Sequence, residues 1–226
     1  MSDARGRGLA FVPYVVVGVL QMASKVLEHV ALDRITRPLL MPALAVPVLL
    51  ALRRAPTRTL ALLLLGIALS WLGDLTLQWF VVGLGCFLLA HLAYLAMLWT
   101  FSGRASAVVT VLAAIVASAW WVGLLALLWP HLGPLKVPVV VYGAALLAMA
   151  TMATRGGVVV AVGGVAFVLS DSGLAFRTFT PLLEGRDADV VIMGLYVVAQ
   201  GLIVFGMLQR LAGSTRGAAV VDVGGT

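Results

Sequence analysis

The chain has 226 residues, of which 62% are hydrophobic and only 11% are charged. Soluble globular domains are about 45–50% apolar and about 25% charged, so these few charges cannot cover a water-exposed surface. The composition excludes a soluble enzyme, a disordered chain and a nucleic-acid-binding protein. It predicts an all-α fold, a polytopic bundle of transmembrane helices.

The net charge of +6 comes from 15 basic and 9 acidic residues. The basic residues stand between apolar runs, where they set membrane topology and meet anionic lipid headgroups. The one cysteine, Cys86, lies within an apolar run. It therefore favours a packing role and excludes both a disulfide framework and a cysteine metal cluster.

A helix needs about 20 apolar residues to cross the hydrocarbon core of a bilayer. Charges, glycines and prolines divide the chain into eight spans, at about 9–24, 38–52, 59–79, 80–101, 105–129, 137–153, 158–178 and 188–210. The first span has the basic flank of a signal peptide, but the hydrophobic segments that follow favour a retained helix. We expect one eight-helix domain over residues 1–212 and a flexible C-terminal tail over 213–226.

The second span is short and rich in proline. It begins at Pro38 and also contains Pro42 and Pro47. Such a segment is either a proline-kinked helix with no ligand nearby, or an interrupted helix that crosses only part of the membrane and borders a binding site.

Lysine and arginine residues predict the orientation in the membrane. With eight spans, both termini share a side with the loops that follow spans two, four and six. That side has nine basic residues: Arg5, Arg7, Arg53, Arg54, Arg58, Arg104, Arg155, Arg210 and Arg216. The other side has six: Lys25, Arg34, Arg37, Lys136, Arg177 and Arg186. The positive-inside rule therefore predicts cytoplasmic termini, in a membrane of the bacterial inner-membrane type.

Ionisable residues inside the spans are the main indication of function. Among the acidic residues, only Asp74 and Asp171 lie within apolar runs, and among the histidines only His91 lies in the middle of a span. A charged side chain at a helix centre costs about 2.5–3.5 kcal/mol on insertion scales, so such groups face the bundle interior. A functional role for both aspartates is favoured over a purely structural one.

Other small and polar residues share helix faces with these groups. In the third span they are Gly66, Ser70, Gly73, Asp74 and Gln78, at helical spacing. The later spans add His91 with Tyr94, Tyr142 beside Gly143, Ser170 beside Asp171, and Tyr196 with Gln200. Taken singly, each tyrosine is typical of packing or of the membrane interface, and Ser170 of a serine bonded to helix backbone. Their alignment predicts one interior polar site.

Two carboxyl groups in a low-dielectric site suit acid–base chemistry, because one can stay protonated while the other is ionised. The sequence has no hydrolase elbow, no phosphate-binding glycine loop and no metalloprotease helix motif. One histidine with two aspartates is a weak set for catalytic zinc, which usually has three protein ligands. We therefore expect neither a metal nor a cofactor.

Five short motifs together resemble the YhhN-like lysoplasmalogenase family. They are Arg37-Pro38-Leu39, Leu72-Gly73-Asp74, Phe87 to Tyr94, Phe167 to Asp171, and Tyr196 to Gln200. They occur in the family's order, between about residues 37 and 205, and the family consists of small eight-helix integral membrane hydrolases. Many members have lysine where this chain has Arg37. Both side chains are cations, but arginine holds a phosphate with a fork rather than a point charge.

The resemblance implies an ether-bond hydrolase that cleaves the vinyl ether bond of lysoplasmalogens to a fatty aldehyde and glycerophospho-ethanolamine or -choline. Its partners would be the lysoplasmalogen and membrane lipids. Asp74 and Asp171 would act as the acid and as the carboxylate that stabilises a developing cation, in either order. His91 and Tyr94 would orient a carboxyl group or the water, and Arg37 would bind the lipid phosphate. The pocket would be lined by Tyr142, Ser170, Tyr196 and Gln200.

Two other functions would use the same residues. A small proton- or cation-coupled transporter would use the aspartates as a relay, and it would be identified by stoichiometric uptake into vesicles without chemical change. A non-catalytic membrane scaffold would use the polar residues only to hold helices together, so Asp74→Asn would cost mainly stability. The family resemblance favours the enzyme.

Overall fold

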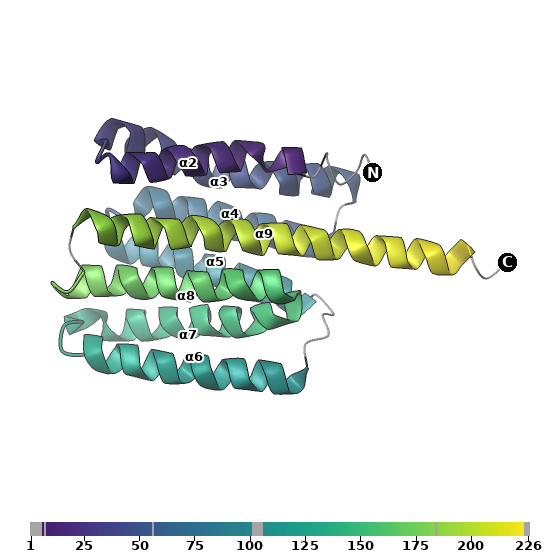
Figure 1. Ribbon diagram of the computed structural model, residues 1–226. Coiled ribbons are helices and arrows are strands. Elements are labelled where there is room, and N and C mark those ends of the chain that lie inside the picture. Colours follow the sequence, from purple (N-terminus) through teal and green to yellow (C-terminus); the bar gives the residue numbers. More distant parts are fainter. Residues whose placement is uncertain (1–5, 7, 56, 101–105, 184, 224–226) are drawn as a thin grey trace.

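The computed structural model describes residues 6, 8–55, 57–100, 106–183 and 185–223, apart from the side chains of residues 54 and 214–223. Over these residues the chain is helical, with short turns and no strand. The helices run back and forth as an elongated bundle (Figure 1). The all-α prediction is confirmed.

The helices follow the predicted spans in order. They are α2 (Val12–Val26), α3 (Val30–Arg54), α4 (Arg58–Thr76), α5 (Phe80–Thr100), α6 (Ala107–Leu128), α7 (Lys136–Ala153), α8 (Val158–Phe179) and α9 (Arg186–Val223). Among the described residues, seven helices are long and apolar enough to cross a bilayer, and α2 is a shorter apolar helix of 15 residues. The chain is therefore a multi-pass membrane protein, as predicted.

Helix α3 differs most from its predicted span. It begins at Val30 rather than near Pro38, and the ring of His29 caps it by accepting a hydrogen bond from the backbone N–H of Leu32 at 3.2 Å. The prediction treated the charges before Pro38 as a loop. They belong instead to the first turns of one continuous helix, so Arg37 lies inside the span.

The prolines of α3 do not interrupt it, and at Pro42 a neighbouring helix replaces the missing donor. Pro42 has no N–H to give to the carbonyl four residues earlier, which is that of Pro38. The indole N–H of Trp71, on α4, donates to this Pro38 oxygen at 2.8 Å. Membrane helices tolerate proline where a neighbour satisfies the freed backbone group in this way.

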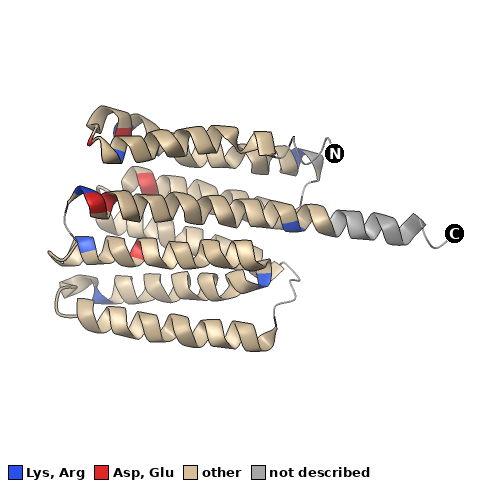
Figure 2. Cartoon of the chain, in the orientation of Figure 1, with Lys and Arg blue, Asp and Glu red and all other residues tan. Residues whose placement is uncertain are grey.

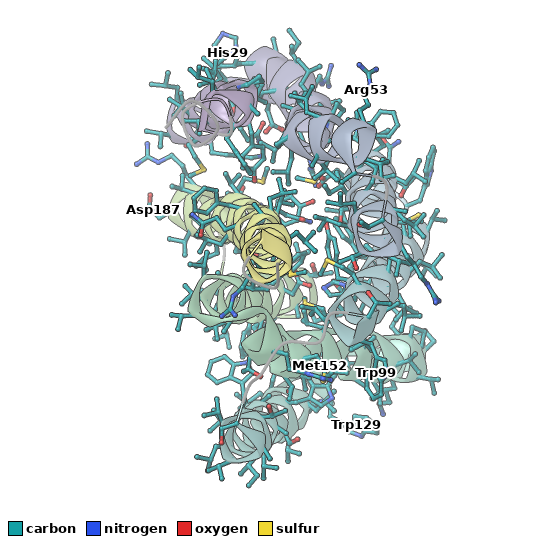
Figure 3. All side chains as sticks on the ribbon, turned by 90° about the vertical axis from the view of Figure 1, so that its right-hand side faces the viewer. His29, Arg53, Trp99, Trp129, Met152 and Asp187 are labelled. Carbon is teal, nitrogen blue, oxygen red and sulfur yellow. The ribbon has the colours of Figure 1, made fainter. Side chains whose placement is uncertain are left out.

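The helices are not packed simply in chain order. Helix α5 packs against α4 and α7, α8 packs against α7 and α9, and α2 joins α9 to α3. Helix α6 lies at the edge of the bundle, against α7 and α8, and is the least buried of the long spans (Figure 1). Figure 3 views the bundle from the end where α9 finishes and shows side chains filling the space between α9 and the helices opposite it.

Charged positions gather at the two ends of the bundle, with an acidic position inside α4 and another inside α8 (Figure 2). Helix α2 begins at the end where α9 finishes. Of the basic residues used to predict orientation, Arg5, Arg7 and Arg104 lie outside the described residues, and only the backbone of Arg54 and Arg216 is described. Cytoplasmic termini stay a prediction, as does the division at residue 212; α9 continues to Val223.

Candidate functional site

Asp74 lies two residues before the end of α4, with only 3% of its side chain exposed. Tyr196 of α9 donates its hydroxyl to Asp74 Oδ2 at 2.8 Å. Arg37 of α3 places Nε 3.7 Å from Asp74 Oδ1. A cation and a hydroxyl donor therefore face this carboxyl group, which is the arrangement that compensates a buried negative charge.

A second layer of hydrogen bonds lies beside Asp74. Tyr94 donates its hydroxyl to Gln200 Oε1 at 2.7 Å, and Gln200 Nε2 donates to Ser70 Oγ at 3.0 Å. All three side chains are buried. Tyr94 fits here because its ring lies on Gly66, where an added Cβ would be 2.2 Å from the ring. The network fixes α4, α5 and α9 to one another around Asp74.

Asp171 forms a separate cluster between α5, α7 and α8. Tyr142 donates its hydroxyl to Asp171 Oδ2. The Nε2 atom of His91 lies 3.9 Å from the same oxygen, which is too far for a direct hydrogen bond. The Asp171 side chain is 11% exposed, more than that of Asp74. Among the ion pairs of the described residues, none joins Asp171 to a lysine or arginine.

The orientation of His91 follows from its other ring nitrogen. Nδ1 lies 2.5 Å from the backbone oxygen of Phe87, and a carbonyl oxygen can only accept, so Nδ1 carries a hydrogen. In the neutral ring, Nε2 then presents a lone pair. This atom is buried and has no hydrogen-bond partner among the described residues. A proton acceptor is therefore aimed into the space beside Asp171.

Aromatic rings connect the two carboxyl clusters. The ring of Phe167 lies 4.8 Å from that of His91 and 5.7 Å from that of Tyr196, measured between centroids. Phe87 packs against Tyr196 from α5, with centroids 6.0 Å apart. Tyr196 donates to Asp74 and His91 faces Asp171, so these rings link the two carboxyl groups. They thus belong to one polar interior with an aromatic layer between its halves.

The predicted site residues fall into two groups and one outlier. One group surrounds Asp74: Arg37, Tyr94, Tyr196 and Gln200. The other surrounds Asp171: His91 and Tyr142. Ser170 instead donates to the backbone oxygen of Ile192 on α9, at 2.9 Å, so it links two helices. Phe87 and Phe167 belong to the sequence motifs, but nothing in the sequence pattern indicates that their rings lie between the two carboxyl clusters.

An apolar cleft runs beside Asp171, between α5, α6, α7 and α8. It contains about 650 Å³ of empty space, part of it open to the surroundings, and is narrow, with about 50 Å³ accessible to the centre of a water molecule. Its wall includes Leu84, Phe87, Trp120, Trp121, Leu124, Val139, Tyr142, Leu146, Asp171 and Phe179. Sequence reasoning missed this cleft because an apolar wall looks like any other part of a membrane span.

Metal ligands do not gather in the described part of the chain: no group of three His, Cys, Asp or Glu side chains is close enough there to hold an ion. What the site offers is two carboxyl groups with different neighbours, a histidine lone pair and an apolar cleft. This set can donate a proton, accept a proton and stabilise positive charge beside an apolar ligand.

Comparisons with known proteins extend the sequence resemblance. A profile of the YhhN family matches residues 32–207. Proteins named lysoplasmalogenase from Mycobacterium bovis and Mycobacterium tuberculosis are each 40% identical over 157 residues, which covers 64% of this chain and 58% of theirs. Human lysoplasmalogenase TMEM86B is 35% identical over 144 residues, 62% of this chain and 60% of its own length. The chain thus spans less than two thirds of these relatives. No solved structure matches it significantly.

Proposed function

The chain belongs to the YhhN family, and from that premise we propose that it is a lysoplasmalogenase, a membrane hydrolase of vinyl ether bonds. The motifs had indicated this family, and the indication is confirmed. The products would be a fatty aldehyde and glycerophospho-ethanolamine or -choline. The observation that carries the proposal is a pair of buried carboxyl groups with different neighbours, one facing a cation and the other facing an apolar cleft.

The neighbours of the two carboxyl groups support different roles for them. Asp74 has the guanidinium group of Arg37 and the hydroxyl of Tyr196, which suit a permanent carboxylate. Asp171 has the hydroxyl of Tyr142 on one oxygen and no lysine or arginine partner among the described residues. Asp171 is therefore the acid, with its proton on Oδ1, and Asp74 supplies negative charge to the site.

Cleavage begins with proton transfer from Asp171 to the vinyl carbon that bears the alkyl chain. The ether oxygen and the adjacent carbon then share a positive charge, as in the oxocarbenium-like transition state of glycosidases. The carboxylate of Asp74 stabilises this charge across the aromatic layer. The faces of Phe87, Phe167 and Tyr196 also favour a cation.

Water then adds to the cationic carbon and gives a proton to Nε2 of His91. The product of this addition is a hemiacetal. Asp171, now a carboxylate, takes the hydroxyl proton of the hemiacetal as the carbon–oxygen bond to glycerol breaks. The protonated His91 returns its proton to the departing glycerol oxygen. One water is consumed, and both side chains regain their starting state.

The remaining residues act through these groups. Tyr94, Gln200 and Ser70 hold the helices that carry Asp74 and Tyr196. The Arg37 side chain is 29% exposed, but its Nε atom, which faces Asp74, is buried. Its contact with Asp74 supports a role as counterion; binding of the lipid phosphate by Arg37 stays a prediction.

The test is release of aldehyde from a defined lysoplasmalogen by the purified protein in detergent. We expect Asp171→Asn to lower the rate by about 10²–10⁴-fold, because it removes the proton donor. Asp74→Asn is expected to lower it by about 10²–10³-fold, because it removes charge stabilisation. Asp187→Asn is the matched control, since its side chain is 93% exposed.

Each variant is first compared with the wild type by thermal unfolding, so that loss of activity is not confused with loss of fold. Folded wild-type protein that releases no aldehyde would refute the proposal. Uptake of lysolipid or of a cation into vesicles without chemical change would identify a transporter instead. Full activity of both folded asparagine variants would remove the carboxyl groups from the mechanism.

A further inference from the structure

We propose that two residues of α2, Lys25 and Gln21, are positioning residues for the site. They hold the carboxyl group of Asp33, so that Arg37 stays directed at Asp74. The resulting charge chain alternates in sign and runs from Lys25 through Asp33 and Arg37 to Asp74. This inference rests on the proposed function, in which Asp74 acts as a carboxylate, and it concerns how the counterion of that carboxylate is kept in place.

The carboxyl group of Asp33, in the first turn of α3, is held from α2. Its Oδ1 atom accepts a hydrogen bond from Gln21 Nε2 at 2.7 Å and lies 2.8 Å from Nζ of Lys25. Gln21 and Lys25 are four residues apart, so both side chains leave α2 on the same face. One oxygen of Asp33 thus has two partners, a cation and an amide donor, and both belong to α2.

Helix geometry alone favours a different partner for Asp33. Arg37 lies four residues after Asp33 in α3, and an acidic residue four positions before a basic one is the favourable order for an ion pair on a helix face. Among the ion pairs of the described residues, however, Asp33 is joined to Lys25, and Arg37 is joined to Asp74. Two contacts between helices therefore replace one contact within α3.

Gln21 is anchored so that its amide nitrogen points at Asp33. Its side chain is fully buried, and Thr36 of α3 donates its hydroxyl to Gln21 Oε1 at 2.5 Å. A carboxylate can only accept a hydrogen bond, so the amide nitrogen must be the atom that faces Asp33. Since a buried amide without partners is costly, these two contacts fix how α2 lies on α3.

The contact of Arg37 with Asp74 is open to competition from another negative charge. Nε of Arg37 lies 3.7 Å from Asp74 Oδ1, beyond hydrogen-bond distance, and this buried nitrogen has no hydrogen-bond partner among the described residues. At Nε the pair is therefore held by charge rather than by a directional bond. An uncompensated Asp33, one helical turn from Arg37, would draw the guanidinium group away from Asp74. The ammonium group of Lys25 cancels that charge.

The charge chain is tested with charge-removing variants at its outer end, by release of aldehyde from a lysoplasmalogen. Lys25→Gln leaves Asp33 uncompensated, so kcat is expected to fall by about tenfold, as on loss of a contact with a charged group, with KM little changed. Lys25→Gln/Asp33→Asn removes both charges and should restore kcat to within about threefold of wild type, because the two sites are coupled. Lys25→Arg keeps the charge and should keep kcat. Where Lys25→Gln folds poorly, Lys25→Met repeats the test with an uncharged side chain of similar length.

Lys136→Gln is the matched control, because it makes the same change at a lysine whose ammonium group lies over the ring of Trp129, 4.7 Å from its centroid. Its kcat should equal that of wild type. An unchanged kcat in Lys25→Gln would overturn the proposal, as would a double variant that stays as slow as Lys25→Gln. Equal losses in Lys25→Gln and Asp33→Asn would also overturn it, because the ion pair would then only hold α2 on α3.

The partner of Arg37 can be identified without turnover, from the melting temperatures of single and double variants. In the wild-type background the effects of Arg37→Gln and Asp74→Asn are expected to be non-additive, whereas those of Arg37→Gln and Asp33→Asn should add. In a Lys25→Gln background the pair with Asp33→Asn should become the non-additive one. This switch without aldehyde release from wild type would keep the charge chain and refute the hydrolase. Aldehyde release without the switch would refute only the charge chain.

Discussion

At the scale of single residues, the two aspartates differ in what compensates their charge. Asp74 faces Arg37 and Tyr196, whereas Asp171 faces Tyr142 and the unpartnered nitrogen of His91. Two aspartate side chains, one in α4 and one in α8, thus have different neighbours. In a buried site such a difference is what separates a proton donor from a charged stabiliser.

The hydroxyl of Tyr196 is expected to matter because it is the hydroxyl donor to Asp74. Tyr196→Phe removes a hydrogen bond to a charged group, a contact of about 1.5–3 kcal/mol, which corresponds to an activity loss of roughly 10–150-fold. Tyr14→Phe is the control, since the Tyr14 hydroxyl donates to the backbone oxygen of Val197 instead. Initial rates of aldehyde release at saturating substrate measure both. Equal rates for the two variants would contradict a role for this hydrogen bond.

The close approach of Tyr94 to Gly66 predicts a second effect. In Gly66→Ala the new methyl group would lie 2.2 Å from the Tyr94 ring, which is fully buried, so the helices must shift at a cost of about 1–3 kcal/mol. Gly123→Ala places the same group on α6 with nothing within 4 Å. It should be neutral or stabilising, because alanine is the better helix former. Thermal unfolding in detergent compares the two, and equal melting temperatures would count against the packing argument.

At the scale of elements, α3 shows how a helix with three internal prolines stays continuous. Each proline leaves the carbonyl four residues earlier without its helical donor. At Pro42 that carbonyl belongs to Pro38, and the indole of Trp71 supplies the donor. The bond ties α3 to α4 one residue from Arg37, so it also fixes where the cation meets Asp74.

A double-mutant cycle tests this replacement. Trp71→Phe leaves the Pro38 carbonyl unpaired and should cost about 1–3 kcal/mol of unfolding free energy, toward the lower end within a membrane. In a Pro42→Ala background the helix regains its own N–H, so the same change should cost less, with a coupling of about 0.5 kcal/mol or more. Trp79→Phe, at a side chain that is 60% exposed, is the control. Strict additivity would show that Trp71 stabilises α3 by packing alone.

At the scale of the whole molecule, the sequence predicts those features that depend on a single helix. The spans follow from length and apolar content, and the interior position of Asp74 and Asp171 follows from the cost of charge in a membrane. The pairing of Tyr142 with Asp171 depends instead on which helices become neighbours. Helix α5 packs on α7 and leaves α6 outside, and no periodicity within a span records that choice.

The placement of Arg37 and the cleft were hidden for related reasons. Charges near a proline resemble a loop, so the sequence alone predicts Arg37 at the membrane edge, whereas α3 begins earlier and places Arg37 beside Asp74. The cleft has an apolar wall, and in a chain that is 62% hydrophobic the residues of this wall cannot be distinguished by sequence from those that face lipid. Both features become visible only once the helices are packed.

The orientation of the bundle predicts which side of the membrane the start of α7 faces. Helix α7 begins with Lys136 at the end opposite that where α9 finishes, so cytoplasmic termini would turn this end outward. His131 and Ser106 are exposed residues that flank α6 at opposite ends, and single cysteines there report on the two sides. In a Cys86→Ala background, a membrane-impermeant maleimide should label His131→Cys in intact cells and Ser106→Cys only after permeabilisation. The reverse pattern would invert the molecule and contradict cytoplasmic termini.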